Sequence, residues 1–222
     1  MCIRDRVRPQ TRLLNPDTLI NWNLDKRYLI ALAEAGVSVV PTRYVARGDA
    51  RSLSEHLETA GWREAVVKPA ISGAGRDTFR VPVPVSAAHE ARYRALVDAE
   101  DMLLQPFLPS ILDNGEVSVV VIDGAVTHAV RKVAAEGEFR VQDDHGGTVH
   151  THTPDADEAA VAAAAIAACS PRPVYARVDL VRMPGGVPAI MELELVEPEL
   201  FFRFAPHAAT QLGAAVAKAL RS

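Results

Sequence analysis

The stretch 188-PAIMELELVEPELFFR-203 decides the fold class, because apolar residues alternate with carboxylates along it. Successive side chains of a β-strand point to opposite faces of the sheet, so the alternation predicts a strand over residues 187–196 with one buried face. The predicted core face holds Met191, Leu193 and Leu195. The predicted opposite face holds Ile190, Glu192, Glu194 and Val196.

The two glutamates of this strand require something that balances their charge. Side chains two residues apart on one strand face lie about 7 Å apart, and two carboxylates at that distance repel by about 2–3 kcal/mol at an effective dielectric of 20. Water can relieve this repulsion, and so can a bound cation. A half-exposed strand with solvated glutamates is the commoner case for such a stretch taken alone.

A second strand over residues 174–182 is expected to pair with this one across the turn 184-PGG-186. Along it Tyr175, Arg177 and Asp179 share a face. If the acidic faces of the two strands coincide, Asp179 converges with the two glutamates. Mg²⁺ prefers hard oxygen ligands completed by water and phosphate, so a magnesium site is the alternative to solvated acids.

The composition limits the classes of protein that remain. The chain has 222 residues, of which 49% are hydrophobic and 23% charged, and its net charge is −4. This is ordinary for one large globular domain, and without a basic excess we expect neither nucleic acid nor a membrane as a partner. The apolar run at 159–169 is too short to span a bilayer. An oligomer is compatible with the sequence, but no pattern encodes one.

Cysteine usage and the N-terminus add two expectations. Cys2 and Cys169 form no disulfide framework and no metal-binding spacing, so a reducing cytoplasm is expected by default. Residues 1–14 show no hydrophobic periodicity, which predicts a disordered or non-native tail before a domain over residues 15–222.

Several further elements are indicated by periodicity and by turn residues. Strands are expected near 37–40, 65–67, 79–83, 102–106, 117–122, 125–132 and 139–142. Helices are expected near 26–35, where Asp25 would be the cap, and near 52–60, 87–99, 154–168 and 207–220. Antiparallel hairpins with interspersed helices predict an α+β fold.

Two segments outside the acidic hairpin are of a kind that binds nucleotides. In 65-AVVKPAISGAGRDT-78, Lys68 ends a strand and a loop of small residues follows, whose backbone N–H groups could approach phosphate. In 102-MLLQPFLPS-110 an apolar strand runs into Gln105 and a Pro-bounded connection, which could present backbone groups to an adenine edge. Taken alone, each is equally compatible with a hairpin loop or a buried strand.

Together these segments resemble the ATP-grasp superfamily, in the type of glutathione synthetase and the ribosomal S6 modification enzymes. The resemblance spans residue 15 to the C-terminus, and within that type it is strongest to ligases related to the cyclo-ligase of D-cycloserine biosynthesis. It is carried by 25-DKRYLIALAEAGVSVVPT-42, 66-VVKPAISGAG-75, 103-LLQPFL-108, 115-GEVSVVVIDGAVTHAVRK-132, 138-EFRVQ-142, 177-RVDLV-181 and 191-MELELVEPELFFR-203.

The resemblance implies two α+β lobes that clamp ATP, a first lobe at about 43–106 and a catalytic lobe at about 107–222. It also implies that a small N-terminal α/β domain, which usually precedes this unit, is missing from the chain. The positions implied to contact ATP are Lys26, Lys68, Ser72, Gly73, Gly75, Gln105, Phe107, Leu108 and Glu116. The implied catalytic cations are Lys132 and Arg140, and the implied magnesium ligands are Asp179, Glu192 and Glu194.

The implied reaction is ATP- and Mg²⁺-dependent, with Mn²⁺ as a possible substitute. ATP phosphorylates a carboxylate, and an amine-type nucleophile then displaces phosphate from the acyl phosphate. In the cyclo-ligase branch both groups belong to one amino-acid-like small molecule. Glu194 departs from the family, because many relatives carry Asn there, and a nearby cation such as Arg177 must balance the extra charge. The alternative is a non-catalytic ATP-binding or scaffold module that keeps the lysines and the hinge.

Two other groups of residues leave alternatives open. His145, His150 and His152 could bind a transition metal or lie in a polar loop near the acceptor substrate. The segment 197–203 could line the acceptor pocket or pack on the last helix.

Overall fold

The computed structural model describes residues 10–73, 75–141 and 146–221. Within these residues the strands form two antiparallel sheets, which confirms the predicted α+β fold. The five-stranded sheet has the order β7 (Thr148–His152), β6 (Ala125–Val133), β5 (Glu116–Ile122), β8 (Tyr175–Arg182) and β9 (Pro188–Glu194). The four-stranded sheet has the order β1 (Arg43–Val45), β4 (Met102–Pro106), β2 (Glu64–Pro69) and β3 (Phe79–Pro82).

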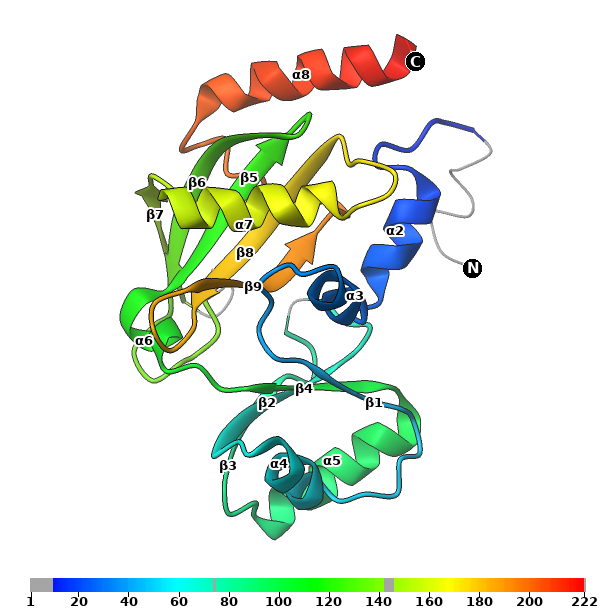
Figure 1. Ribbon diagram of the computed structural model, residues 1–222, viewed down its shortest axis with the longest axis vertical. Coiled ribbons are helices and arrows are strands. Elements are labelled where there is room, and N and C mark those ends of the chain that lie inside the picture. Colours follow the sequence, from blue (N-terminus) through cyan, green and yellow to red (C-terminus); the bar gives the residue numbers. More distant parts are fainter. Residues whose placement is uncertain (1–9, 74, 142–145, 222) are drawn as a thin grey trace.

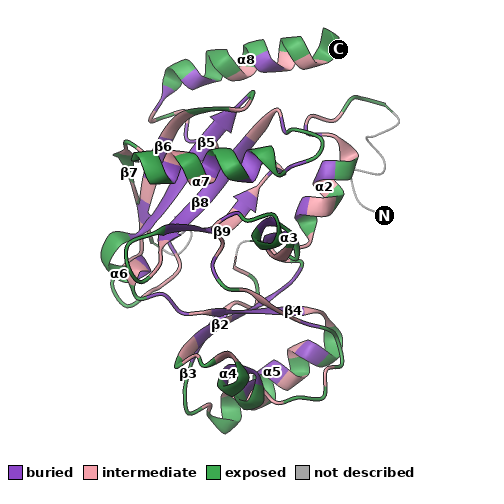
Figure 2. Cartoon of the chain, viewed as in Figure 1, coloured by how far each residue is buried: buried purple, intermediate pink, exposed green. Residues whose placement is uncertain are grey.

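Helices cover the sheets in layers (Figure 1). The helices are α2 (Asp17–Leu24), α3 (Tyr28–Glu34), α4 (Leu53–Ala60), α5 (Ala87–Ala99), α6 (Ser110–Asn114), α7 (Ala156–Ala167) and α8 (Pro206–Arg221). Helices α7 and α8 pack on opposite faces of the larger sheet, because Val119 and Val121 belong to the core under α7 while Val120 and Ile122 belong to the core under α8. The burial pattern in Figure 2 follows the same layers, with buried strands inside and exposed helix faces outside.

Among the described residues, helices cover one face of the smaller sheet. Ala65 and Val67 of β2 pack with α4 and α5, and Tyr93 is fully buried there. The residues between them, Val66 and Lys68, point to the uncovered face, which looks toward the larger sheet. The uncovered face is therefore available for a ligand.

Local capping explains why the helices begin where they do. Ser52 and Glu55 form a capping box at the start of α4, and Asp155 and Glu158 form another at the start of α7. Both starts agree with the sequence-based expectation. The first predicted helix is different: Asp25 accepts from the backbone and side chain of Arg27, and α3 begins only at Tyr28.

Other boundaries also differ from the prediction. Residues 37–40 form only an isolated parallel bridge, between Val39 and Ile190. Residues 139–141 are not a strand, and Gln142 and His145 lie outside the described residues. The short elements α2, α6, β1 and β7 were not predicted, because each has too few residues to show a clear period.

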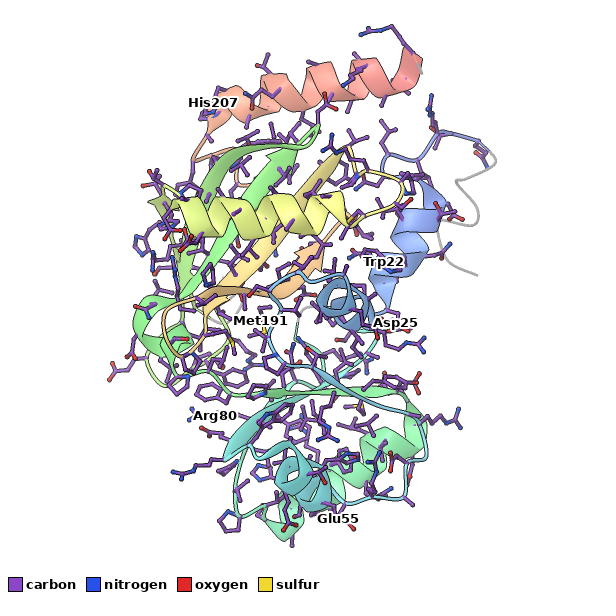
Figure 3. The ribbon with its side chains drawn as sticks, in the orientation of Figure 1. Trp22, Asp25, Glu55, Arg80, Met191 and His207 are labelled. Carbon is purple, nitrogen blue, oxygen red and sulfur yellow. The ribbon has the colours of Figure 1, made fainter. Side chains whose placement is uncertain are left out.

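A β-bulge in β9 makes one part of the strand prediction wrong. Asp179 pairs with Glu192 while the next residue, Leu180, pairs with Ile190, so Met191 is the extra residue. The bulge shifts the alternation by one position. As a result Ile190 lies in the core under α7, whereas Met191 lines the cavity between the two sheets (Figure 3).

Strand β9 lies at the edge of its sheet, and its outer backbone groups are satisfied by the N-terminal segment rather than by another strand. Tyr28 Oη accepts from the Leu193 amide at 2.9 Å, and the Asn15 side chain donates to the Leu195 carbonyl at 3.0 Å. The Ile190 amide donates to the Ser38 carbonyl at 2.9 Å. The edge is thus closed by segment 15–40, which removes unpaired groups that would otherwise favour aggregation.

Across the described ranges, no helix is both long enough and apolar enough to cross a membrane.

We expect Tyr28→Phe to destabilise the protein by about 1–3 kcal/mol, because the buried Leu193 amide loses its acceptor. Tyr93→Phe is the matched control, since within the described residues the buried Tyr93 hydroxyl has no hydrogen-bond partner. Its removal should cost less than about 0.5 kcal/mol. Urea unfolding of both variants measures the difference, and equal losses would contradict the assigned role of the Tyr28 hydroxyl.

Candidate active site

A cavity of about 620 Å³ lies between the two sheets. It is lined by β2 and β4 of the smaller sheet and by β8 and β9 of the larger one. Predicted site residues that line it are Lys26, Lys68, Ser72, Gly73, Gly75, Gln105, Phe107, Leu108, Glu116, Arg140, Glu192 and Glu194. Lys132 and Asp179 do not line it, and lie behind its wall.

Lys68 carries a buried charge that no carboxylate among the described residues contacts directly, although Glu192 and Glu116 attract it from a greater distance. Its side chain is 7% exposed, and its ammonium forms no ion pair or hydrogen bond with the residues that the structure describes. Burial, together with repulsion from Lys26, lowers the pKa of Lys68 from 10.5 to about 8. An ammonium in such a place is a site for an anion such as phosphate.

Lys26 connects three parts of the site. Its ammonium donates to the Ser72 carbonyl at 2.5 Å and lies 3.3 Å from the Glu192 carboxylate, while its backbone amide donates to the Ala70 carbonyl at 2.8 Å. Lys26 therefore ties the small-residue loop after β2 to the acidic strand β9.

The loop after β2 is held from its outer side as well. The Arg76 guanidinium contacts both carboxylate oxygens of Glu100 at 2.7 Å and donates to the Ile71 carbonyl at 2.9 Å. Gly75 has φ +66°, a conformation that glycine adopts at little cost. The loop backbone thus lies against the cavity while its arginine points to the end of α5.

Behind the cavity wall lies a buried cluster of charges. Arg177 holds both oxygens of Asp179 at 2.9 Å, Lys132 reaches one of them at 3.1 Å, and Ser118 donates to the other at 2.6 Å. Lys132 also contacts Glu116 at 2.5 Å. Burial alone would raise the pKa of Asp179, but Arg177 and Lys132 outweigh it and hold that pKa below its usual range.

The acidic side of the cavity is formed by Glu192 and Glu194. Asp179 is directly opposite Glu192 in the β8–β9 pairing, and Arg177 is opposite Glu194 and forms an ion pair with it. Burial and repulsion from Asp179 raise the pKa of Glu194 to about 8 despite this pair. The ionised form of Glu194 would therefore gain from a further cation.

The described residues contain no ready-made cluster of three metal-binding side chains. Glu192 and Glu194, with side chains 30% and 29% exposed, present carboxylate oxygens to the cavity, which suits Mg²⁺ completed by phosphate and water. Both oxygens of Asp179 are engaged by Arg177, so Asp179 could join such a site only if this pairing rearranged.

The opposite end of the cavity is apolar and has a hinge between the lobes. The Phe107 amide donates to the Glu64 carbonyl at 3.0 Å, so this group is not free to bind a base. The Leu108 amide has no acceptor among the described residues, and it remains available to an adenine edge. Arg80 stacks on the Phe107 ring at 3.6 Å and is fixed by Glu64. Arg80 itself lies in the smaller lobe (Figure 3).

Arg140 lies on the cavity wall and is partly unsatisfied. The Arg140 guanidinium donates to the Glu138 carboxylate at 2.6 Å, and this hydrogen bond lowers the pKa of Glu138 to about 2. The Arg140 Nε is buried and has no partner within the described part of the chain. This donor is suited to an anionic ligand in the cavity.

The sequence matches a known family. Residues 31–196 match the family described as the RimK-like ATP-grasp domain. The chain belongs to this family. It is 37% identical to the cycloserine biosynthesis protein DcsG of Streptomyces lavendulae, over 98% of this chain and 76% of that protein. The predicted ATP-grasp fold and the predicted class, an ATP-grasp ligase, are thereby confirmed.

Solved structures agree with this assignment. The crystal structure of D-cycloserine synthetase DcsG is similar with a TM-score of 0.84 and 34% identity, covering 97% of this chain and 76% of that one. The structure of D-alanine–D-alanine ligase from Bacillus anthracis complexed with ATP is similar in fold, with a TM-score of 0.67 and 16% identity. The latter match covers 91% of this chain and 66% of that chain.

Sequence reasoning missed three cavity-lining features. Asn23 lines the cavity from the end of α2, Met191 enters through the bulge, and Thr78 closes the loop after β2. Asn23 lies in 17-DTLINWNL-24, where a polar residue gives no sign of being buried. No sequence signal for the bulge was available.

We expect Lys68→Met to raise the stability of the ligand-free protein at pH 7 by about 1–3 kcal/mol while it removes nucleotide binding. The reason is that burial lowers the pKa of Lys68 to about 8, so the charged form opposes folding below pH 8 and this cost disappears as the pH rises toward 10.5. The stability difference should therefore shrink between pH 8 and pH 10.5. Denaturant unfolding at several pH values measures it, and a variant less stable than the unaltered protein at pH 7 would show that Lys68 already has a partner.

Proposed function

We propose that the chain is an ATP- and Mg²⁺-dependent ligase that joins a carboxylate to an amine-type nitrogen of an amino-acid-derived small molecule. The observation that carries the proposal is the charge arrangement of the cavity, with the unpaired Lys68 on one sheet and the glutamates of β9 on the other. A nucleoside triphosphate supplies anionic oxygens for the Lys68 ammonium, and its divalent cation supplies positive charge for the glutamates of β9.

The chain's own residues have distinct roles in this proposal. The hinge with Leu108 binds adenine, and the ammonium groups of Lys68 and Lys26 bind phosphate oxygens. Glu192 and Glu194 hold Mg²⁺, with Asp179 as a further ligand if Arg177 releases it. When bound, Mg²⁺ neutralises charge that develops on the transferred phosphoryl group.

Arg140 stabilises the second half of the reaction, in which the amine attacks the acyl phosphate. ATP phosphorylates the substrate carboxylate, the amine attacks the resulting acyl phosphate, and phosphate leaves. Arg140, with its unpartnered Nε, is placed to bind the acyl phosphate or the oxyanion that forms during attack. Lys132 supports this site from behind, because its ammonium helps to hold the pKa of Asp179 low and forms an ion pair with Glu116.

We further propose that nucleophile and carboxylate belong to one substrate, so that the product is a ring. Support comes from the likeness to D-cycloserine synthetase DcsG over nearly the whole chain. A cytoplasmic location, where ATP is available, stays a prediction. The test is phosphate release from ATP across a panel of amino acids and ureido acids. Release with a single substrate supports cyclisation, and release that requires two substrates contradicts it.

A non-catalytic ATP-binding module is the second candidate, because Arg177 already forms ion pairs with two of the three acids, Asp179 and Glu194. The two candidates differ in their response to Glu192→Gln. For a ligase we expect about a 100-fold or larger loss of turnover, since a charge that stabilises the transition state is removed. Nucleotide binding without metal and thermal unfolding should change little, because the Glu192 side chain is 30% exposed and the buried Lys26 ammonium keeps the Ser72 carbonyl as a partner. Unchanged turnover in this variant would exclude the metal role of Glu192.

We expect the affinity for a non-hydrolysable ATP analogue to fall as the pH rises through about 8. The reason is that phosphate binds the ammonium form of Lys68, whose pKa is about 8 in the free protein. Calorimetric titration between pH 7 and pH 9.5 measures the profile, for the unaltered protein and for Lys68→Arg. The arginine variant keeps its charge over this range, so its profile should fall less steeply, and the slope that remains belongs to Glu194, whose pKa is also about 8. Equal slopes in both proteins would assign the whole pH dependence to a group other than Lys68.

A further inference from the structure

Strand β9 must present its glutamates at fixed positions although it lies at the sheet edge. Its inner side is paired with β8 through Glu192 and Glu194, and its outer backbone groups belong to Leu193 and Leu195. An edge strand without a neighbour is free to bend and twist, and movement of the backbone moves the carboxylates with it. What holds the outer side of β9 therefore matters for the cavity.

Asn23 takes the place of a neighbouring strand at this point. Its side-chain Nδ2 donates to the Leu193 carbonyl at 2.7 Å, and its Oδ1 accepts from the Leu195 amide at 2.9 Å. These two bonds lie on either side of Glu194 and resemble the paired bonds between antiparallel strands. Asn23 is 8% exposed, so water does not replace them readily.

The same short segment contacts β9 at two further points. Tyr28 Oη accepts from the Leu193 amide, and the Lys26 ammonium lies 3.3 Å from the Glu192 carboxylate. Residues 23–28 thus hold the strand at Leu193 and Leu195, on both sides of Glu194, and at the Glu192 side chain. Asn23 lines the cavity, but its amide oxygen and one of its N–H groups are already engaged with β9. This points to a role that acts through the strand.

We infer that Asn23 is a positioning residue that fixes the backbone on both sides of Glu194 and so sets the affinity of the cavity for the divalent cation that accompanies the nucleotide. The inference rests on the proposed function and deepens it. Metal–oxygen distances tolerate shifts of only about 0.2 Å, so a small displacement of β9 weakens binding. Residues that orient metal ligands typically change metal affinity about 10–100-fold when they are replaced.

The experiment measures Mn²⁺ binding by electron paramagnetic resonance in the presence of a saturating non-hydrolysable ATP analogue. We expect Asn23→Ala to weaken Mn²⁺ binding about 10–100-fold. Binding of the analogue without metal, measured by calorimetry, should change less than about threefold, because Lys68 and the hinge are unaltered.

Asn15→Ala is the matched control. Asn15 is likewise a buried amide from the N-terminal segment, and it contacts the backbone of Leu195, Tyr175 and Val174 rather than both sides of Glu194. Urea unfolding should show a comparable loss of stability in both variants, but Asn15→Ala should keep the Mn²⁺ affinity of the unaltered protein. An equal loss of Mn²⁺ affinity in the control would overturn the inference, since the effect would then follow stability alone.

Asn23→Gln is a second variant, for the case that Asn23→Ala does not fold. It keeps both amide groups but is one methylene longer, so it displaces the contact without removing it. We expect weaker Mn²⁺ binding here too. If either Asn23 variant binds Mn²⁺ as tightly as the unaltered protein does, the inference about Asn23 is overturned while the proposed function stands. If the unaltered protein binds the analogue but no Mn²⁺, the proposed function fails and the inference fails with it.

Discussion

The burial of charge is the constraint on which the rest of this structure depends. Charged groups inside a protein are tolerated only when partners and hydrogen bonds compensate for lost hydration. Asp179 meets this condition through Arg177, Lys132 and Ser118, whereas Glu116 pairs with Lys132 but keeps a raised pKa because burial outweighs that partner. Lys68 meets this condition only in part, because burial lowers its pKa to about 8 even though Glu192 and Glu116 attract the ammonium. The site is thus stable on the β8 side and incomplete on the cavity side, as a place built for an anionic ligand would be.

The edge of the larger sheet ties this electrostatic arrangement to the N-terminal segment. Residues 15–40 close the outer side of β9 with side-chain amides, a tyrosine hydroxyl and one backbone bridge, and Lys26 extends from the same segment to the loop after β2. Phosphate binding, cation binding and sheet integrity therefore share one short stretch of chain. A change in this stretch should alter both stability and ligand affinity, and matched variants are needed to separate the two effects.

Much of the fold could be predicted from local patterns, and particular residues show where prediction stopped. The helices expected near 52–60 and 154–168 are present close to those bounds, and the alternation in β9 correctly gave the side on which Glu192 and Glu194 lie. The alternation failed at Met191, because a bulge depends on pairing with β8 and not on local sequence. The resemblance to the ATP-grasp superfamily named residues that do gather around one cavity, but it gave no sign that Arg177 encloses Asp179 or that Asn23 supports β9.

A crystal structure with Mg²⁺ and a non-hydrolysable ATP analogue tests the central claim most directly. The account predicts that a phosphate oxygen lies within hydrogen-bond distance of Lys68 Nζ and that Mg²⁺ joins the phosphates to Glu192 and Glu194. A nucleotide bound in the cavity with Lys68 still unpaired, or with the cation held away from both glutamates, would contradict it.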